Sequence, residues 1–294
     1  MKSIWQQNLL ELIRRTSSDL PPDVCNALER ARRRERQGSP ARWALDTIRE
    51  NIRLARERGA PLCQDTGTLN FYGRVPVGFD VIALSAGMRA AVRQATRLGY
   101  LRQNTIDTLT DKSCPTNIGP GAPVMHWKFV RSRRVDIRLI MKGGGSENMS
   151  IQYSLPDAKL NANRDWEGVR RCALDAVLQA QGNGCAPGVL GIGIGGDRAT
   201  GAELAKYQLL RRLADQSTEQ RLARLEQRIT REANMTAIGP MGFGGKTALL
   251  GVKIGVMSRL PASYFVSVAY MCWAFRRRGV TLEPDGRVHR WLYP

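Results

Sequence analysis

Apolar residues recur at helical spacing through the first 60 residues. In residues 4–15 (IWQQNLLELIRR) they lie three or four positions apart, which is typical of a helix with one buried face. A second helix is expected to begin at the proline pair 21–22, because proline suits the first turn of a helix. A third is expected over residues 41–58, with Gly59 as its end. The pattern therefore predicts a helical N-terminal layer.

After residue 60, short β-type runs alternate with further helical patterns. Helices are expected over residues 85–99, 166–182 and 218–233, and the last is clearly amphipathic. The runs that favour strands occupy residues 69–79, 124–130, 134–142, 188–196, 246–257 and 264–275. The second and third of these are expected to pair with each other through a turn at 131–134. We therefore predict an α+β fold in a single domain over residues 1–294, with a mixed sheet flanked by helices.

The charge is strongly positive. Lys and Arg together number 45 against 26 acids, which gives a formal net charge of +19. We interpret the excess as a solvated basic surface, because the arginines fall in helix-like stretches such as residues 31–36 and 274–279 (AFRRRG). Attraction of small dianions is a second interpretation. A nucleic-acid-binding protein is the less favoured alternative, because aromatic residues make up only 6% of the chain.

The sequence shows no targeting or membrane segment. No run approaches the ~20 consecutive apolar residues that a membrane span needs. The first 15 residues lack the apolar core and small-residue cleavage site of a signal peptide. We therefore expect no membrane partner and a cytoplasmic location. In that reducing compartment the cysteines are expected to be thiols rather than a disulfide framework. They are Cys25, Cys63, Cys114, Cys172, Cys185 and Cys272.

Four loops combine glycine with residues that can carry chemistry. Residues 61–67 (PLCQDTG) offer a thiol, an amide and a carboxylate in succession. Residues 142–148 (KGGGSEN) follow a strand, and three glycines let a backbone approach an anion closely. Residues 185–196 (CAPGVLGIGIGG) and 238–247 (IGPMGFGGKT) are the other two. Taken singly, each loop also has the plain interpretation of a turn.

Two nucleotide-binding motifs are excluded. Residues 191–196 satisfy G-x-G-x-x-G, but these glycines lie within an apolar strand, where glycine more often allows close packing. Residues 238–247 end in GKT, but the P-loop spacing requires a glycine at position 240, which is Pro240. Neither loop is therefore expected to bind a nucleotide.

Taken together, the loops resemble the iron–sulfur hydro-lyases, which are the class I fumarases and the L(+)-tartrate dehydratases. The motifs that carry the resemblance, in order, are PLCQDTG, LRQNTID, KGGGSENMS, the Cys-x-Pro loop before GIGIGG, IGPMGFGGKT and YMCWAFRR. They cover nearly the whole chain from about Pro61 onward. The resemblance implies that Cys63, Cys185 and Cys272 hold a [4Fe-4S] cluster whose fourth iron stays open as a Lewis acid. Cys114 lies outside the matching motifs and is not expected to bind iron.

The resemblance also implies substrate contacts. Gln64 and Asp65 follow the first cluster ligand, and Asp65 is the candidate for proton transfer. Arg102 would clamp a substrate carboxylate, and Gly145 would offer its backbone N–H. The implied activity is the reversible hydration of a C4 dicarboxylate, most simply fumarate to malate, with L(+)-tartrate dehydration as the alternative.

The chain departs from the family pattern at several positions, among them residues 205–212 (AKYQLLRR), and the resemblance also implies a partner. Ala186 stands where the family usually has a second proline, and Leu260 stands where relatives often carry a histidine. In single-chain class I enzymes a C-terminal domain supplies further Arg, Lys and Thr residues to the active site. No counterpart follows the third ligand region here, so the resemblance implies a separate β subunit in an α2β2 assembly.

Overall fold

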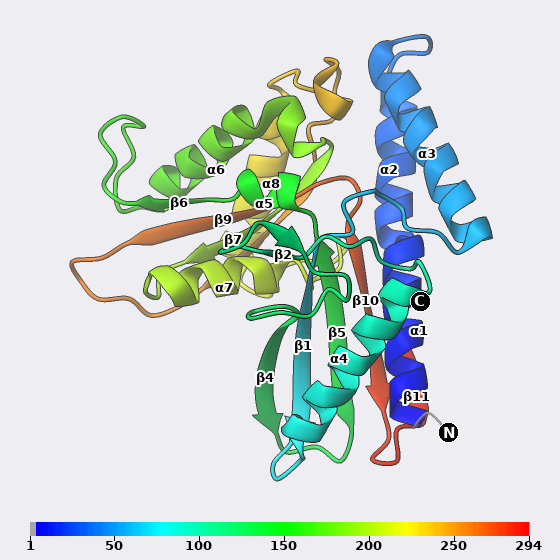
Figure 1. Cartoon of the computed structure of the whole chain (residues 1–294). Helices are drawn as coiled ribbons and strands as arrows, with labels where there is room; N and C mark the ends of the chain where they lie inside the picture. Colours follow the sequence, from blue (N-terminus) through cyan, green and yellow to red (C-terminus); the bar gives the residue numbers. More distant parts are fainter. Residues whose placement is uncertain (1–3, 294) are drawn as a thin grey trace. The chain divides into compact units, whose positions relative to one another are not determined.

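The computed structural model describes residues 4–293 (Figure 1). The chain divides into two compact units, each built from segments that are distant in the sequence. Unit 1 contains the described residues up to Pro22, then Glu50–Gly144, then those from Ala274 onward. Unit 2 contains Asp23–Arg49 and Gly145–Trp273. Each unit has its own hydrophobic core. The predicted α+β class is confirmed, whereas the single domain stays a prediction.

Unit 1 is a five-stranded sheet with helices packed on one face (Figure 1). The order along the sheet is β11-β10-β5-β1-β4, and only β1 and β4 run parallel. Leu12 and Met88, from the two helices, pack with Phe71 and Ile137 of the sheet to form the core. The elements are α1 (Ile4–Ser18), β1 (Thr68–Pro76), α4 (Val81–Arg97), β4 (Val124–Val130), β5 (Val135–Lys142), β10 (Arg276–Leu282) and β11 (Val288–Leu292).

The predicted pairing of residues 124–130 with residues 134–142 is wrong. Both segments form strands, but β1 lies between them, so that Asn70 pairs with Val124 on one side and with Ile140 on the other. β1 buries Leu69, Phe71 and Val75, and a strand that is buried in this way takes a central position with a neighbour on each edge. The helix α4 provides the crossover that joins the parallel pair β1 and β4.

The second correction concerns the arginines at residues 276–278, which the sequence places on a solvated helix. They lie in β10, between β5 and β11, with exposed fractions of 1%, 0% and 8%. The guanidinium of Arg277 lies over the ring of Phe275, with 4.3 Å between Cζ and the ring centroid. Arg278 donates a hydrogen bond of 2.9 Å to Asp19. Aromatic and acidic neighbours therefore compensate the charges of Arg277 and Arg278, which the sequence assigns to solvent.

Unit 2 is a four-stranded sheet in the order β6-β9-β7-β8, with helices on both faces. Leu190 and Ile192 of β7 face a core formed with α6 and α8. Its elements are α2 (Pro22–Arg34), β6 (Ile151–Ser154), α6 (Trp166–Ala180), β7 (Gly188–Ile194), α7 (Arg198–Gln208), α8 (Gln220–Asn234), β8 (Leu249–Val256) and β9 (Phe265–Met271). Helix α3 (Pro40–Arg58) contains the point where the chain passes from unit 2 to unit 1.

The glycines of β7 allow close packing, as the sequence interpretation held. A Cβ at Gly191 would lie 2.1 Å from the carbonyl oxygen of Ala205, and one at Gly193 would lie 2.4 Å from that of Gly201. Both carbonyls belong to α7, so this helix lies directly on the backbone of the strand. Helix α7 was not predicted, although Asp197 and Thr200 form a capping box at its N-terminus.

Short elements complete the chain. They are β2 (Ile106–Asp107), β3 (Lys112–Ser113), α5 (Gly144–Asn148), the 3-10 turn η1 (Gln181–Gly184) and the 3-10 turn η2 (Pro240–Gly242). Among residues 4–293, no helix has the length and apolar character that crossing a bilayer requires.

Candidate functional site

The first candidate loop, Cys63–Gly67, lies in unit 1 between α3 and β1. Its start is fixed by Leu62, which is buried and donates its N–H to the carbonyl of Ser17 at 2.9 Å. Its end is fixed by Gly67, which has a φ of +76° and lies against the backbone of Lys142, where a Cβ would come within 2.5 Å of the carbonyl. Cys63 is half-buried in this loop, and the Gln64 side chain is exposed.

The carboxylate of Asp65 is held from two sides. Its Oδ2 lies against Gly143, where a Cβ would approach within 2.7 Å, so a side chain at that position would displace the carboxylate. On the other side, the Asn104 amide Nδ2 donates to Oδ1 over 3.3 Å. The glycine run after β5 thus makes room for Asp65, and the LRQNTID segment orients it.

Asn117 holds the segment that contains Arg102. Its Oδ1 accepts the backbone N–H groups of Asn104 and Thr105, at 2.9 and 3.1 Å. Its Nδ2 donates to the carbonyl of Arg102 at 2.7 Å and to Thr96 Oγ1 at 3.0 Å. Asn117 is 3% exposed. This single buried amide therefore fixes the backbone of residues 102–105 and leaves the Arg102 side chain exposed.

These segments line a cavity of about 620 Å³ in unit 1. The structure therefore brings together Gln64, Asp65 and Arg102, three of the four predicted substrate contacts. The wall offers amides, one cation and one carboxylate, a set of groups that fits a small polar anion. The lining residues are Gln64, Asp65, Thr96, Leu101, Arg102, Gln103 and Asn104.

Cys185 and Cys272 lie on adjoining loops of unit 2. The antiparallel pair β7 and β9 places Val189 opposite Met271. Cys185 precedes β7 and Cys272 follows β9, so both cysteines flank the same end of the strand pair. The two loops are also bonded, because the Trp273 N–H donates to the carbonyl of Cys185 at 3.1 Å.

Tyr270 packs beneath the Cys185 loop. A Cβ at Gly184 would lie 2.6 Å from its ring, and a Cβ at Gly188 would lie 2.5 Å from it, so the ring fills the space that these glycines leave. Burial raises the pKa of Tyr270, and the nearby Cys272 and Cys185 raise it further. The phenol is therefore a neutral packing group for the loop.

The fourth loop, residues 238–247, supports the Cys185 loop instead of binding a phosphate. Its Met241 N–H donates to the carbonyl of Ala186 at 2.8 Å. Its Lys246 N–H donates to the buried Glu35 carboxylate, at 2.8 and 3.1 Å to the two oxygens. The anion inside this glycine-rich turn is thus a side chain of the protein itself.

The remaining predicted residues are divided between the units. Gly145 is exposed in unit 2, and a Cβ there would meet nothing within 4 Å. Cys63 belongs to unit 1, whereas Cys185 and Cys272 belong to unit 2. Within either unit, the described residues include no group of three His, Cys, Asp or Glu side chains arranged to hold a metal.

Two other cysteines differ from these in their surroundings. Cys172 is fully buried in the core of unit 2, and burial raises the pKa of its thiol to about 12. Cys114 is half-buried, and its sulfur lies 3.4 Å from the Thr116 hydroxyl, a contact that lowers the pKa of the thiol.

The residues that hold the loops of Asp65, Arg102 and Cys185 in place were not predicted from the sequence. Asn104, Tyr270 and Glu35 lie in stretches that the sequence singles out, but no role was predicted for them, and Asn117 lies in none of those stretches. Only Asn117 carried a usable signal. It stands in a Pro-Thr-Asn-Ile-Gly stretch, and asparagine in such a turn often adopts a positive φ, here +56°, and bonds nearby backbone.

The fumarate hydratase (Fumerase) family model matches residues 6–281 of the chain. The chain belongs to the fumarate hydratase family. Family members include a Geobacillus stearothermophilus protein named "Putative fumarate hydratase class I", which is 48% identical over 98% of this chain. This chain spans 57% of the length of that relative.

Two other relatives of this chain are closer to it in length. A Methanocaldococcus jannaschii protein named "Putative L(+)-tartrate dehydratase subunit alpha" is 33% identical over 95% of this chain and 98% of its own length. The L(+)-tartrate dehydratase subunit alpha of Escherichia coli K12 is 28% identical over 92% of this chain and 88% of its own length. The family is thus one of hydro-lyases, which bears out the resemblance seen in the motifs.

Proposed function

We propose that this chain is the cluster-bearing subunit of a [4Fe-4S]-dependent hydro-lyase that interconverts fumarate and malate. The observation that carries the proposal is the cavity that brings Gln64, Asp65 and Arg102 together beside the Cys63 loop. Dehydration of L(+)-tartrate is the second candidate, and it is favoured by the names of two relatives whose lengths match this chain closely.

The thiols fit a cluster of this kind. Cys185 and Cys272 lie on adjoining loops, and Cys63 directly precedes Gln64 and Asp65. Thiolates are the usual ligands of such clusters, and three of them leave one iron without a protein ligand. When bound, the cluster would supply a Lewis acid for a substrate oxygen.

The other predicted residues would bind and orient the substrate. Arg102 would take one carboxylate on its planar fork, since its backbone is fixed by Asn117 while its side chain is exposed. The Gly145 N–H would hold a second oxygen, as the family resemblance implies, and Gly145 is exposed in the short helix α5. Asp65 would move a proton at the substrate, and the Asn104 amide would keep its carboxylate in one orientation.

The test is anaerobic reconstitution of the full chain with iron and sulfide, followed by analysis of bound iron. Cys63→Ser, Cys185→Ser and Cys272→Ser are each expected to abolish stable cluster binding. Cys25→Ser and Cys114→Ser are the matched controls and are expected to retain it. Wild-type iron content in all of the first three variants would contradict the ligand assignment.

The same preparation tests the substrate clamp. Arg102→Lys keeps the charge but loses the fork, so turnover with a β subunit present is expected to fall by roughly tenfold or more while the iron content stays unchanged. Unchanged turnover would exclude Arg102 as the clamp. A panel of fumarate, malate and tartrate identifies the substrate. A colourless protein whose nucleic-acid binding falls steeply with salt would favour the alternative class.

A further inference from the structure

Arg276, the first residue of β10, carries a buried charge without a partner. Its side chain is 1% exposed. Its Nε and Nη1 nitrogens are buried and donate no hydrogen bond, and among residues 4–293 no carboxylate forms an ion pair with the guanidinium. Arginine does not lose its proton inside proteins, so the positive charge is retained. A buried charge of this kind is costly unless an anion compensates it.

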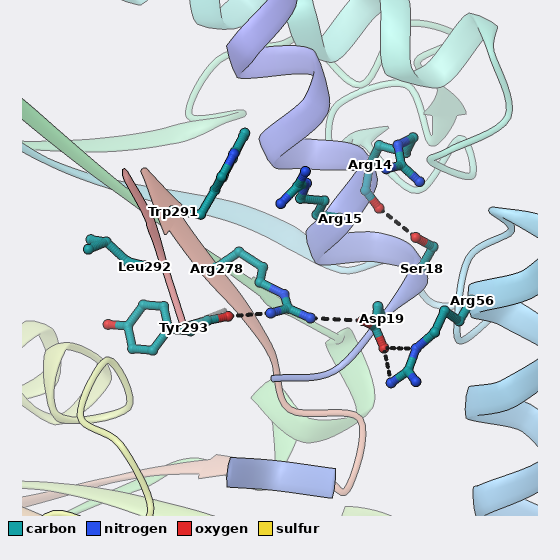
Figure 2. Close-up of a pocket in the computed structure, with 9 residues that line it drawn as sticks. All are labelled: Arg14, Arg15, Ser18, Asp19, Arg56, Arg278, Trp291, Leu292 and Tyr293. Carbon is teal, nitrogen blue, oxygen red and sulfur yellow. Dashed lines mark hydrogen bonds and ion pairs between the residues drawn. The ribbon is translucent and has the colours of Figure 1, made fainter. Parts of the chain in front are cut away.

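The next arginine on the same side of β10 is compensated. Side chains alternate along a strand, so Arg276 and Arg278 point to the same face of the sheet. Arg278 donates to the Asp19 carboxylate at 2.9 Å and to the carbonyls of Leu20 and Tyr293, and Figure 2 shows the bonds to Asp19 and Tyr293. The chain thus supplies an anionic partner for one arginine and none for the other.

The strand register places Arg276 at the end of the sheet where the Cys63 loop enters. Arg276 lies opposite Met141 of β5, and Met141 lies opposite Leu69 of β1, so the three residues form one row across the sheet. Leu69 and Met141 belong to the core beneath the helices, and Arg276 therefore lies on that face as well. Cys63 stands only six residues before Leu69 in the chain.

The Cys63 loop starts on this same face of the sheet. Leu62 donates its N–H to the carbonyl of Ser17, in the last turn of α1, at 2.9 Å. Helix α1 packs against β10 and β5. The loop then runs to Thr68, the first residue of β1. It therefore passes from the side of β10 and β5 to β1, at the end of the sheet where Arg276 lies.

The chemistry of an iron–sulfur cluster matches what Arg276 lacks. A cluster held by thiolates carries a net negative charge, and its sulfur atoms accept hydrogen bonds from N–H groups. A substrate carboxylate is the less suitable partner, because Arg276 does not line the cavity that contains Gln64 and Arg102.

We propose that Arg276 donates its unpaired N–H groups to the sulfur atoms of a [4Fe-4S] cluster bound at Cys63. The inference rests on the proposed function, because it requires that cluster. A positive charge and N–H donors beside the sulfur atoms favour the reduced, more negative cluster, so Arg276 raises its reduction potential. The same contacts help to retain the iron.

The first test uses the full chain without a cluster. Arg276→Met is expected to be at least as stable as the wild type in chemical denaturation, because it removes a buried charge that has no partner. Arg278→Met is the matched control on the same strand and is expected to be less stable, because Asp19 loses a buried partner. If Arg276→Met is destabilised or fails to fold, the polypeptide itself compensates Arg276, and the proposal is overturned.

The second test uses the anaerobically reconstituted chain and measures the reduction potential of the cluster by titration with electron paramagnetic resonance. Arg276→Met is expected to shift the equilibrium toward the oxidised cluster at least about tenfold, which is about 59 mV for one electron. It should also release iron faster to a chelator. Arg276→Lys keeps the charge but loses the fork, so a smaller shift is expected. Arg89→Met removes a charge from an exposed position of α4 and should leave the potential unchanged.

The results distinguish this inference from the proposed function. If the wild-type chain takes up no iron, both are wrong. If the wild type holds its cluster but Arg276→Met has the same potential and the same iron release, the role of Arg276 alone is overturned. A raised KM for the dicarboxylate at an unchanged potential would assign Arg276 to the substrate and would also overturn the inference.

Discussion

Asn117 contributes no group to the cavity around Gln64 and Arg102, yet it fixes the segment that does. A buried amide satisfies two donors and two acceptors at once, which neither a carboxylate nor a hydroxyl can do. The charged residues of the site can be recognised from sequence motifs. The amide that orients them leaves only the turn-like Pro-Thr-Asn-Ile-Gly stretch as a signal, because three of its four partners are backbone groups, which any residue could supply.

Cys114 provides a test of how one hydrogen bond affects one thiol. The Thr116 hydroxyl lowers the pKa of Cys114, so its thiolate is present at a lower pH than that of an ordinary cysteine. Alkylation of Cys114 by iodoacetamide is therefore expected to rise at lower pH than for a free thiol. Thr116→Val should move that rise to higher pH. Mass spectrometry of the alkylated peptides between pH 6 and 10 measures both.

Cys172 is the internal control for this measurement. Burial raises the pKa of Cys172 to about 12, so it is expected to resist alkylation across the same range. An unchanged Cys114 profile in Thr116→Val would show that the hydroxyl does not set the reactivity.

At the scale of elements, most helices and strands could be predicted from the sequence. The pairing of the strands with one another could not. Helices such as α1 and α8 carry a periodic apolar face, which is a local signal. The position of β1 between β4 and β5 cannot be read from any short stretch of sequence. It depends on which of the three strands buries the most surface, and that is decided by contacts between distant segments. The strand β10 was missed for a related reason, because three consecutive arginines indicate solvent unless their partners, Phe275 and Asp19, are known in advance.

Glu35 shows how one element depends on another. Its carboxylate, 6% exposed at the end of α2, accepts the Lys246 N–H of the loop that supports Cys185. Glu35→Ala is expected to lower the free energy of unfolding by about 1–3 kcal/mol, because two hydrogen-bond contacts to a buried, charged acceptor are lost. It should also speed hydrogen exchange in residues 238–247. Chemical denaturation and exchange mass spectrometry are the measurements.

Glu29→Ala is the matched control for this variant. Glu29 lies on the same helix and pairs with the largely exposed Arg33 at 3.0 Å and, at a longer 3.4 Å, with Arg32, which keeps its stronger partner Asp46; its loss should therefore cost at most about 0.5 kcal/mol. Equal effects of the two variants would mean that the loop does not depend on Glu35.

At the scale of the whole molecule, we expect the proposed activity to depend on a β subunit. The cavity in unit 1 offers one arginine, Arg102, whereas a C4 dicarboxylate carries two carboxylates. The cluster-loaded chain alone is therefore expected to turn over fumarate at least about 100-fold more slowly than the same chain with its β subunit, since a missing acid or base typically costs that much. Anaerobic assays with and without the partner measure the ratio.

The mass of the active species tests the assembly. An α2β2 complex is expected from light scattering of the active mixture. Full turnover by a homogeneous preparation of this chain would refute the need for a β subunit, and the missing base would then have to be among its own residues.

Unit 1 is formed by three separate segments of the chain, so its strands are synthesised at different times. A ribosome makes residues 23–273, which include the whole of unit 2, before it reaches β10 and β11. Until Arg276–Leu282 emerges, the edge of β5 that faces away from β1 is open, and the backbone groups there can pair with another nascent chain. The arginines that begin β10 are thus made after the whole of unit 2, and their arrival converts an exposed edge into the interior of a sheet.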